Sequence, residues 1–146
     1  LGLQTLTGTA LTNHPNYRLL AKFRYKVEGR MLDKWYDHGV TLHGAWTRLG
    51  LDRISQSTVM QSDAYKTYVR YVRRYDGQIY WHKNSIFEPP IEYGGSHAEL
   101  MAKVKVWAAA DRPKWYVKEM LQLEKATMKT DPDYKYYLKF LELRGK

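Results

Sequence analysis

Histidines are the side chains of this sequence best suited to acid–base or metal chemistry near neutral pH. Two of them, His38 and His43, stand close together, with Asp37 adjoining. A metal site on a helix would need two histidines one turn apart on one face, together with an acidic third ligand. Gly39 and Gly44 interrupt the helix that such a site requires, so we expect no metal here. The five histidines are His14, His38, His43, His82 and His97.

Motifs of the common enzyme families are also absent from the sequence. It contains no Gly-x-Ser-x-Gly, no phosphate-binding loop, no Gly-x-Gly-x-x-Gly and no His-Glu-x-x-His. It contains no cysteine either, which excludes thiol nucleophiles and cysteine metal sites. The carboxylates are scattered, as expected for helix caps and solvated faces. We therefore expect a protein that is not an enzyme, holds no cofactor and acts by binding.

The charge of the chain favours an acidic partner. Twenty-four Lys and Arg residues against 15 Asp and Glu residues give a formal charge of +9. Basic side chains gather in two segments, at residues 18–30 and 66–74. A solvated face that keeps the protein soluble explains such clusters, and so does a surface for nucleic acid or anionic lipid. The load of 13 Tyr and five Trp residues suits both cores and protein interfaces.

The elements that must position these side chains occur twice. The block at 35–51, WYDHGVTLHGAWTRLGL, aligns without gaps on the block at 107–123, WAAADRPKWYVKEMLQL. After a length change of three residues, YKTYVRYV at 65–72 aligns on YKYYLKFL at 134–141. Helical propensity alone does not explain this order and spacing, so we infer two copies of one helical unit. The identical pairs include Trp35 with Trp107, Leu49 with Leu121, Leu51 with Leu123, Tyr65 with Tyr134 and Tyr68 with Tyr137.

Local signals divide the chain into four parts. We expect a loose arm at 1–13, a first helical unit at 14–76, a linker at 77–96 and a second unit at 97–146. The pair Asp76-Gly77 is predicted to end a helix. Aromatic residues, Pro89-Pro90 and Gly94-Gly95 mark the linker, and Ser96-His97-Ala98-Glu99 has the spacing of a capping box.

The two copies resemble the WY-domain modules of oomycete, Phytophthora-type, RxLR effectors. The resemblance is carried by a Trp at a helix end, a turn, an apolar helix ending in Leu-x-Leu and a Tyr-rich last helix. The second copy, with DRPKWYVKEMLQL and DYKYYLKFL, is the closer match. The first copy departs from it, because Gly39-Val40-Thr41 lacks the proline of the second turn and Trp46 stands where the second copy has Lys118.

This resemblance implies an all-α fold in which two tandem WY-like units, of three or four helices each, form a helical bundle. It also implies a virulence or avirulence protein that a plant pathogen secretes and that enters plant cells. There, in the cytoplasm, in the nucleus or at the plasma membrane, it would bind a host plant protein and suppress or alter immunity. The sequence does not name that target.

Two sets of residues follow from the repeat and the linker. The predicted structural core consists of Trp35, Leu49, Leu51, Tyr65, Tyr68, Trp107, Leu121, Leu123, Tyr134 and Tyr137. The predicted partner-binding residues, expected to be exposed, are Trp46, Trp81, Phe87, Tyr93 and Trp115. Nucleic acid and anionic membranes remain the alternatives to a protein partner, and the sequence leaves a homodimer open.

Overall fold

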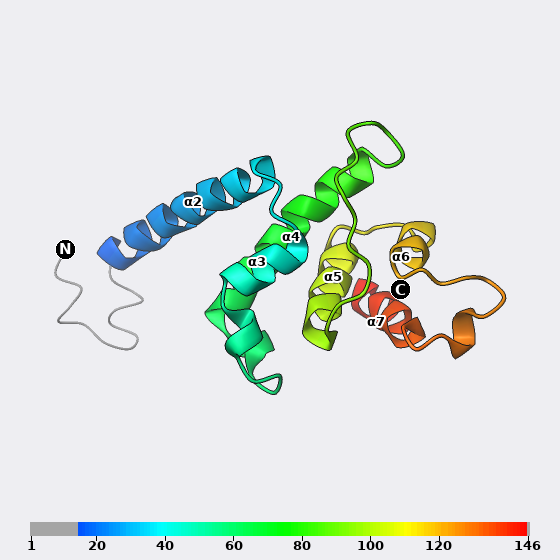
Figure 1. The fold of residues 1–146 in the computed structure, drawn as a ribbon. Coiled ribbons are helices and arrows are strands. Elements are labelled where there is room, and N and C mark those ends of the chain that lie inside the picture. Colours follow the sequence, from blue (N-terminus) through cyan, green and yellow to red (C-terminus); the bar gives the residue numbers. More distant parts are fainter. Residues whose placement is uncertain (1–14, 146) are drawn as a thin grey trace. The chain divides into compact units, whose positions relative to one another are not determined.

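The computed structural model describes residues 15–145, and all regular structure in that range is helical (Figure 1). The predicted all-α class is therefore confirmed, while the arm predicted at 1–13 lies outside the described residues. Short 3-10 turns, η2 to η4, connect the helices at Leu51–Arg53, Val59–Gln61 and Met128–Thr130. The α-helices are α2 (Pro15–Asp37), α3 (Leu42–Arg48), α4 (Asp63–Trp81), α5 (His97–Ala109), α6 (Lys114–Met120) and α7 (Tyr134–Arg144).

The chain forms two compact units, residues 1–39 and residues 40–146. Helix α2 belongs to the first and carries both basic and apolar side chains on its surface, Leu19 and Phe23 among them. In the second unit α3 packs on α4, α4 packs on α5, and α5 packs on α7. The division into helical units at 14–76 and 97–146 stays a prediction from the repeat.

Side-chain caps fix where the helices of the second unit begin. The hydroxyl of Thr41 accepts a hydrogen bond from the Gly44 N–H, and that of Ser62 accepts one from the Tyr65 N–H. At α5 the predicted capping box is confirmed, because Ser96 and Glu99 each accept the backbone N–H of the other. Each cap satisfies backbone donors that the first turn of a helix leaves unpaired.

Helix α4 is longer than the sequence predicted. It continues through Asp76-Gly77 and ends at Trp81, where the His82 N–H bonds to the Gln78 carbonyl. A glycine inside a helix costs only about 1 kcal/mol. Tertiary contacts outweigh that cost, since the Asp76 side chain is buried and accepts three hydrogen bonds from other elements.

The sequence repeat has a counterpart in the backbone. Helix α6 begins and ends 72 positions after α3, and η4 lies 69 positions after η3, which reproduces the length change of three residues. The turns correspond as well. Gly39 and Asp111 both have left-handed φ angles, of 74° and 53°, and so do Gly50 and Gln122, at 72° and 55°. The first turn therefore adopts this geometry without a proline.

Tyrosines hold the core of the second unit together. The hydroxyl of Tyr65 donates to the Ala98 carbonyl of α5, and that of Tyr71 donates to the Val40 carbonyl ahead of α3, both at 2.7 Å. Three residues predicted for the core are only half-buried, namely Trp35, Leu49 and Tyr134. The other seven are buried, namely Leu51, Tyr65, Tyr68, Trp107, Leu121, Leu123 and Tyr137.

Trp46 was expected to be exposed, and that expectation is wrong. Its side chain is only 6% exposed. Its ring meets those of Tyr68 and Tyr65 edge to face, with centroids 4.9 and 6.2 Å apart. Such edge-to-face pairs place the positive edge of one ring on the negative face of the next, which favours an aromatic core. Trp46 is therefore unavailable as a surface anchor.

Candidate functional site

An exposed aromatic surface lies in the second unit, where the end of α4, the loop after it and α6 come together. We define this aromatic surface by Tyr80, Trp81, Ile86, Phe87 and Trp115. Four of these side chains are largely open to solvent: Trp81 is 76% exposed, Ile86 93%, Phe87 69% and Trp115 55%. Large apolar side chains that gather on a surface in this way mark interaction sites more often than scattered single ones do.

The last turn of α4 supplies the centre of this surface. Tyr80 is half-buried, and its ring contacts Trp81 edge to face at 5.3 Å and stacks on Trp115 at 6.5 Å between centroids. Beneath it, the Tyr116 ring lies edge to face at 5.0 Å and the Arg112 guanidinium sits 4.2 Å from the ring centre. Tyr80 thereby joins two tryptophans that are 34 positions apart in the sequence.

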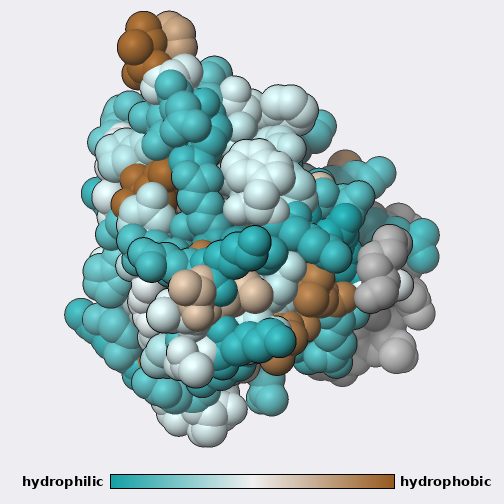
Figure 2. Space-filling model, turned by 90° about the vertical axis from the view of Figure 1, so that its right-hand side faces the viewer, coloured by the Kyte–Doolittle hydropathy of each residue, from teal (hydrophilic) through white to brown (hydrophobic). Residues whose placement is uncertain are grey.

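The loop after α4 brings a second apolar element to the same surface. Lys83, largely buried, reaches the Glu119 carboxylate of α6 at 3.3 Å and that of Glu88 at 3.7 Å. The Phe87 ring lies 6.0 Å from the His82 ring. Figure 2 shows hydrophobic atoms projecting at the top of the view, where Figure 1 places this loop. The loop is thus tied to α6 while its apolar side chains point outward.

A buried carboxylate anchors the elements that carry the aromatic rings. Asp76 of α4 accepts hydrogen bonds from the Trp107 indole at 3.0 Å, the Tyr116 hydroxyl at 2.7 Å and Arg112 Nε at 2.9 Å. Burial, and then the neighbouring Asp76 carboxylate, raise the pKa of Tyr116, so this hydroxyl keeps its proton and donates. The network fixes the start of α6, and hence Trp115, against α4.

The structure joins two of the five predicted binding residues, Trp81 and Trp115, through the Tyr80 ring, and a third, Phe87, is exposed on the adjoining loop against His82. Trp46 lies in the core, and the exposed Tyr93 lines a separate polar pocket beside Glu92 and Glu99. Sequence reasoning missed Tyr80 and Ile86 as members of this surface. The available signal for Ile86 was the apolar pair Ile86-Phe87 in an otherwise polar run just ahead of Pro89-Pro90, which no core pattern explains.

A metal-holding group and a membrane-spanning helix are both absent among residues 15–145. Among residues 15–145, no three His, Asp or Glu side chains come together in an arrangement that could hold a metal ion. No helix in this range combines the length and apolar character needed to cross a membrane. What the described residues do present is a supported set of aromatic rings, and such a set can bind.

Comparison with known proteins identifies the family. No family model matches the chain, and no solved structure is significantly similar. A protein described as "Secreted RxLR effector protein", from Phytophthora infestans strain T30-4, is 36% identical over the whole chain. This chain belongs to the RxLR effectors of oomycetes.

A second relative of this effector comes from the same organism. It is named "RxLR effector protein Avr1" and is 34% identical over 73% of the chain. The effector chain spans 64% of the length of the first relative and 47% of the second. The resemblance inferred from the repeat is thus confirmed for the family, while the WY units themselves stay a prediction.

Proposed function

We propose that this effector is secreted by its pathogen, enters plant cells and binds a host protein through the aromatic surface, thereby altering immunity. Two observations support the proposal. Its relatives carry the names of secreted RxLR effectors, one of them an avirulence protein by name. The observation that carries the choice of surface is the pairing of exposed Trp81 and Trp115 on the supported ring of Tyr80.

The energetics of protein interfaces favour these rings as anchors. Each tryptophan can remove about 150–250 Å² from water, and truncating such an anchor commonly costs 2 kcal/mol or more of binding free energy. Tyr80 and the Asp76 network restrain Trp81 and Trp115 before binding, which lowers the entropy that a partner must overcome.

Two of the cations beside the aromatic surface are held by carboxylates, which favours a protein over nucleic acid. Arg112 is bound to Asp76, and Lys83 is bound to Glu88 and Glu119. Nucleic-acid binding draws most of its affinity from cations that are free to meet phosphates. The two cations that support this surface are already paired with carboxylates. Its apolar area is therefore the main source of binding free energy that it can offer a partner.

A capture experiment from plant extract tests the proposal. Wild type is compared with a Trp81→Ala/Trp115→Ala double variant, and circular dichroism checks that both are folded. Leu138→Ala is the matched control, because Leu138 is an exposed apolar residue of α7 outside the aromatic surface. We expect a plant protein that wild type and the control retain and the double variant loses. Its affinity for the double variant should fall at least about 30-fold, which corresponds to a loss of about 2 kcal/mol of binding free energy.

Two outcomes would count against the proposal. A host partner that the double variant binds as well as wild type would move the interface elsewhere. Captured material that consists of nucleic acid and is released steeply by salt would favour the basic segments of the chain instead.

A further inference from the structure

A small polar pocket of about 180 Å³ lies in the second unit and shares no residue with the aromatic surface. The start of α3, the first half of α4, the loop ahead of α5 and α5 itself contribute to its walls. Its polar lining consists of His43, Tyr68, Glu92, Tyr93, Glu99 and Lys103.

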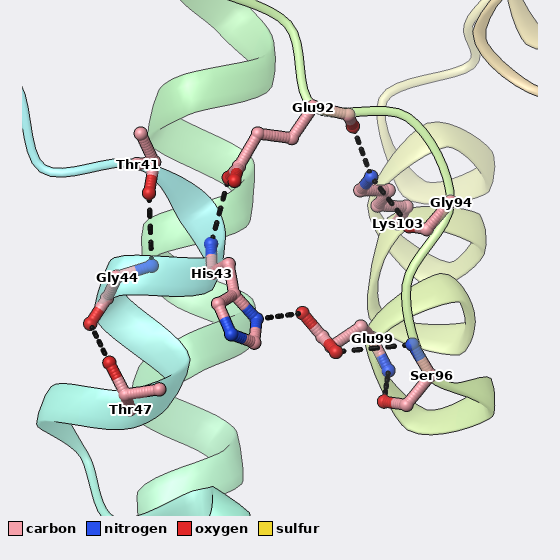
Figure 3. Close-up of polar contacts among 9 residues, drawn as sticks. All are labelled: Thr41, His43, Gly44, Thr47, Glu92, Gly94, Ser96, Glu99 and Lys103. Atoms are coloured by element: carbon pink, nitrogen blue, oxygen red, sulfur yellow. Dashed lines mark hydrogen bonds and ion pairs between the residues drawn. The ribbon is translucent and has the colours of Figure 1, made fainter.

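Hydrogen bonds hold both carboxylates of the pocket in place (Figure 3). Glu92 accepts the backbone N–H of His43 at 2.9 Å, and the imidazole Nδ1 of His43 lies 3.3 Å from Glu99 Oε2. The other Glu99 oxygen accepts the Ser96 N–H of the capping box at 3.1 Å. The positions of the carboxylates are therefore set by two partners, His43 of α3 and the N-cap Ser96 of α5.

Lys103 closes one side of the pocket and is occupied by the backbone. Its ammonium group donates to the Glu92 carbonyl at 2.8 Å and to the Gly94 carbonyl at 3.3 Å (Figure 3). These bonds point the ammonium group of Lys103 toward the backbone of the loop ahead of α5. Burial lowers the pKa of Lys103, and the nearby Glu92, Glu99 and Asp76 carboxylates offset part of that effect by stabilising its charge. The two carboxylates outnumber this one cation.

Tyr68 is the unexplained group of the pocket. Its side chain is 0% exposed, yet among the described residues its hydroxyl has no hydrogen-bond partner. Burying a hydroxyl without a partner costs about 1–3 kcal/mol. Tyr68 lines the same pocket as Glu92 and Glu99, and burial, followed by these two carboxylates, raises the pKa of its hydroxyl. A molecule in the pocket would supply the missing partner.

We propose that this pocket binds a primary ammonium group, with Glu92, Glu99 and the Tyr68 hydroxyl as its recognition set. An ammonium has three donors and no acceptor. It can therefore donate to carboxylate oxygens and to a hydroxyl oxygen. Its positive charge also complements the pocket, in which two carboxylates face one lysine. The volume lies below the 300–1,000 Å³ typical of drug-sized ligands, so the pocket fits a short amine or the end of a lysine side chain.

Titration with small probes followed by NMR of the whole chain tests this. The probes are n-butylamine, with 1-butanol and butyrate as neutral and anionic matches of the same length, at one fixed pH. We expect saturable shifts at residues of the pocket with butylamine and none with butanol or butyrate. Equal responses to all three probes, or no saturable response to the amine, would leave the pocket with water alone and overturn the proposal.

Variants locate the site and keep the test independent of folding. Tyr68→Phe removes only the hydroxyl, which has no described partner to lose, and we expect it to weaken butylamine binding about fivefold, as one hydrogen bond would. Glu92→Gln should weaken it as well. Tyr134→Phe, the same change outside the pocket, should leave it unchanged. Amine binding that persists in full in Tyr68→Phe would contradict the assignment.

One further arm separates the two sources of the ammonium. Nα-acetyl-lysine methylamide carries the same group at the end of a peptide unit. Binding comparable to that of butylamine assigns the pocket to a lysine side chain of a protein, and binding of butylamine alone assigns it to a free amine. This inference does not depend on the proposed function, because it uses none of the residues of the aromatic surface.

Discussion

The two copies of the helical repeat place corresponding residues alike and pack them differently. In the first copy Trp46 of α3 lies edge to face on Tyr68 of α4, 4.9 Å between centroids. In the second copy the corresponding pair is Lys118 of α6 and Tyr137 of α7, with the ammonium 5.4 Å from the ring centre. Tyrosine is the constant partner, and an indole in one copy is replaced by a cation in the other.

This difference shows that the path of the backbone and the packing of the side chains are determined by different residues. The left-handed turn positions, Gly50 and Gln122 among them, recur in both copies although their residue types differ. The side chain on the tyrosine can be buried and aromatic or half-buried and charged without altering the helix–turn–helix path. Burial should therefore stabilise the first contact much more than the second.

Asp76 should produce the largest effect, since it links the copies rather than repeating within them. We expect Asp76→Asn to lower the free energy of unfolding by about 4 kcal/mol. The change removes the negative charge that pairs with buried Arg112. It also places the NH2 group of asparagine against groups that themselves donate hydrogen bonds to Asp76. Urea unfolding followed by circular dichroism measures this.

Asp111→Asn is the control for Asp76. Asp111 pairs with Arg144 at 2.9 Å, but its side chain is mostly in solvent. An exposed ion pair contributes less than about 1 kcal/mol, and asparagine tolerates the left-handed backbone of this position. Equal effects of the two substitutions would mean that burial of the Asp76 network does not strengthen it.

Trp46→Ala tests the aromatic contact of the first copy. We expect a loss of about 3 kcal/mol in the free energy of unfolding, toward the low end for a buried Trp. Trp46 lines a small hollow of about 110 Å³, so neighbouring side chains have room to collapse. Thermal unfolding measures the effect, and a change below about 1 kcal/mol would place Trp46 with the surface residues after all.

The sequence was a good guide wherever a pattern depended on several residues together. The repeat predicted the recurrence of α3 as α6, and the Ser96–Glu99 spacing predicted a helix start. It was a poor guide at Gly77 and Trp46. Local propensity predicted that α4 ends at Gly77. Hydrogen bonds from distant donors to Asp76 instead stabilise the helix beyond that residue. A difference between copies suggested a surface position for Trp46, whereas the rings of α4 bury it.

The corresponding turn residues Gly50 and Gln122 offer a finer comparison. Gly50→Ala should destabilise by about 1 kcal/mol, because an L side chain at a φ of 72° meets its own backbone. Gln122→Gly should relieve that strain at the second turn and stabilise by up to about 1 kcal/mol. Chemical unfolding measures both.

Gly77→Ala provides the opposite control for Gly50→Ala. Gly77 lies inside α4, and an added Cβ there would meet no atom within 4 Å. Alanine should therefore stabilise by about 0.5–1 kcal/mol through helix propensity. Destabilisation by Gly77→Ala would instead support a helix that ends at Asp76.

Lys118→Met should have the smallest effect, a loss of about 0.5–1 kcal/mol. It keeps a flexible stem against Tyr137 and removes only the attraction between the ammonium and the ring. Lys129→Met, which neutralises an exposed lysine of η4, corrects for the change in net charge. The difference between the two variants should shrink as salt is added, because a half-exposed cation is screened. Lys118→Met could instead lower the free energy of unfolding as much as Trp46→Ala does. The ammonium contact of the second copy and the indole contact of the first would then be equivalent in energy as well as in position.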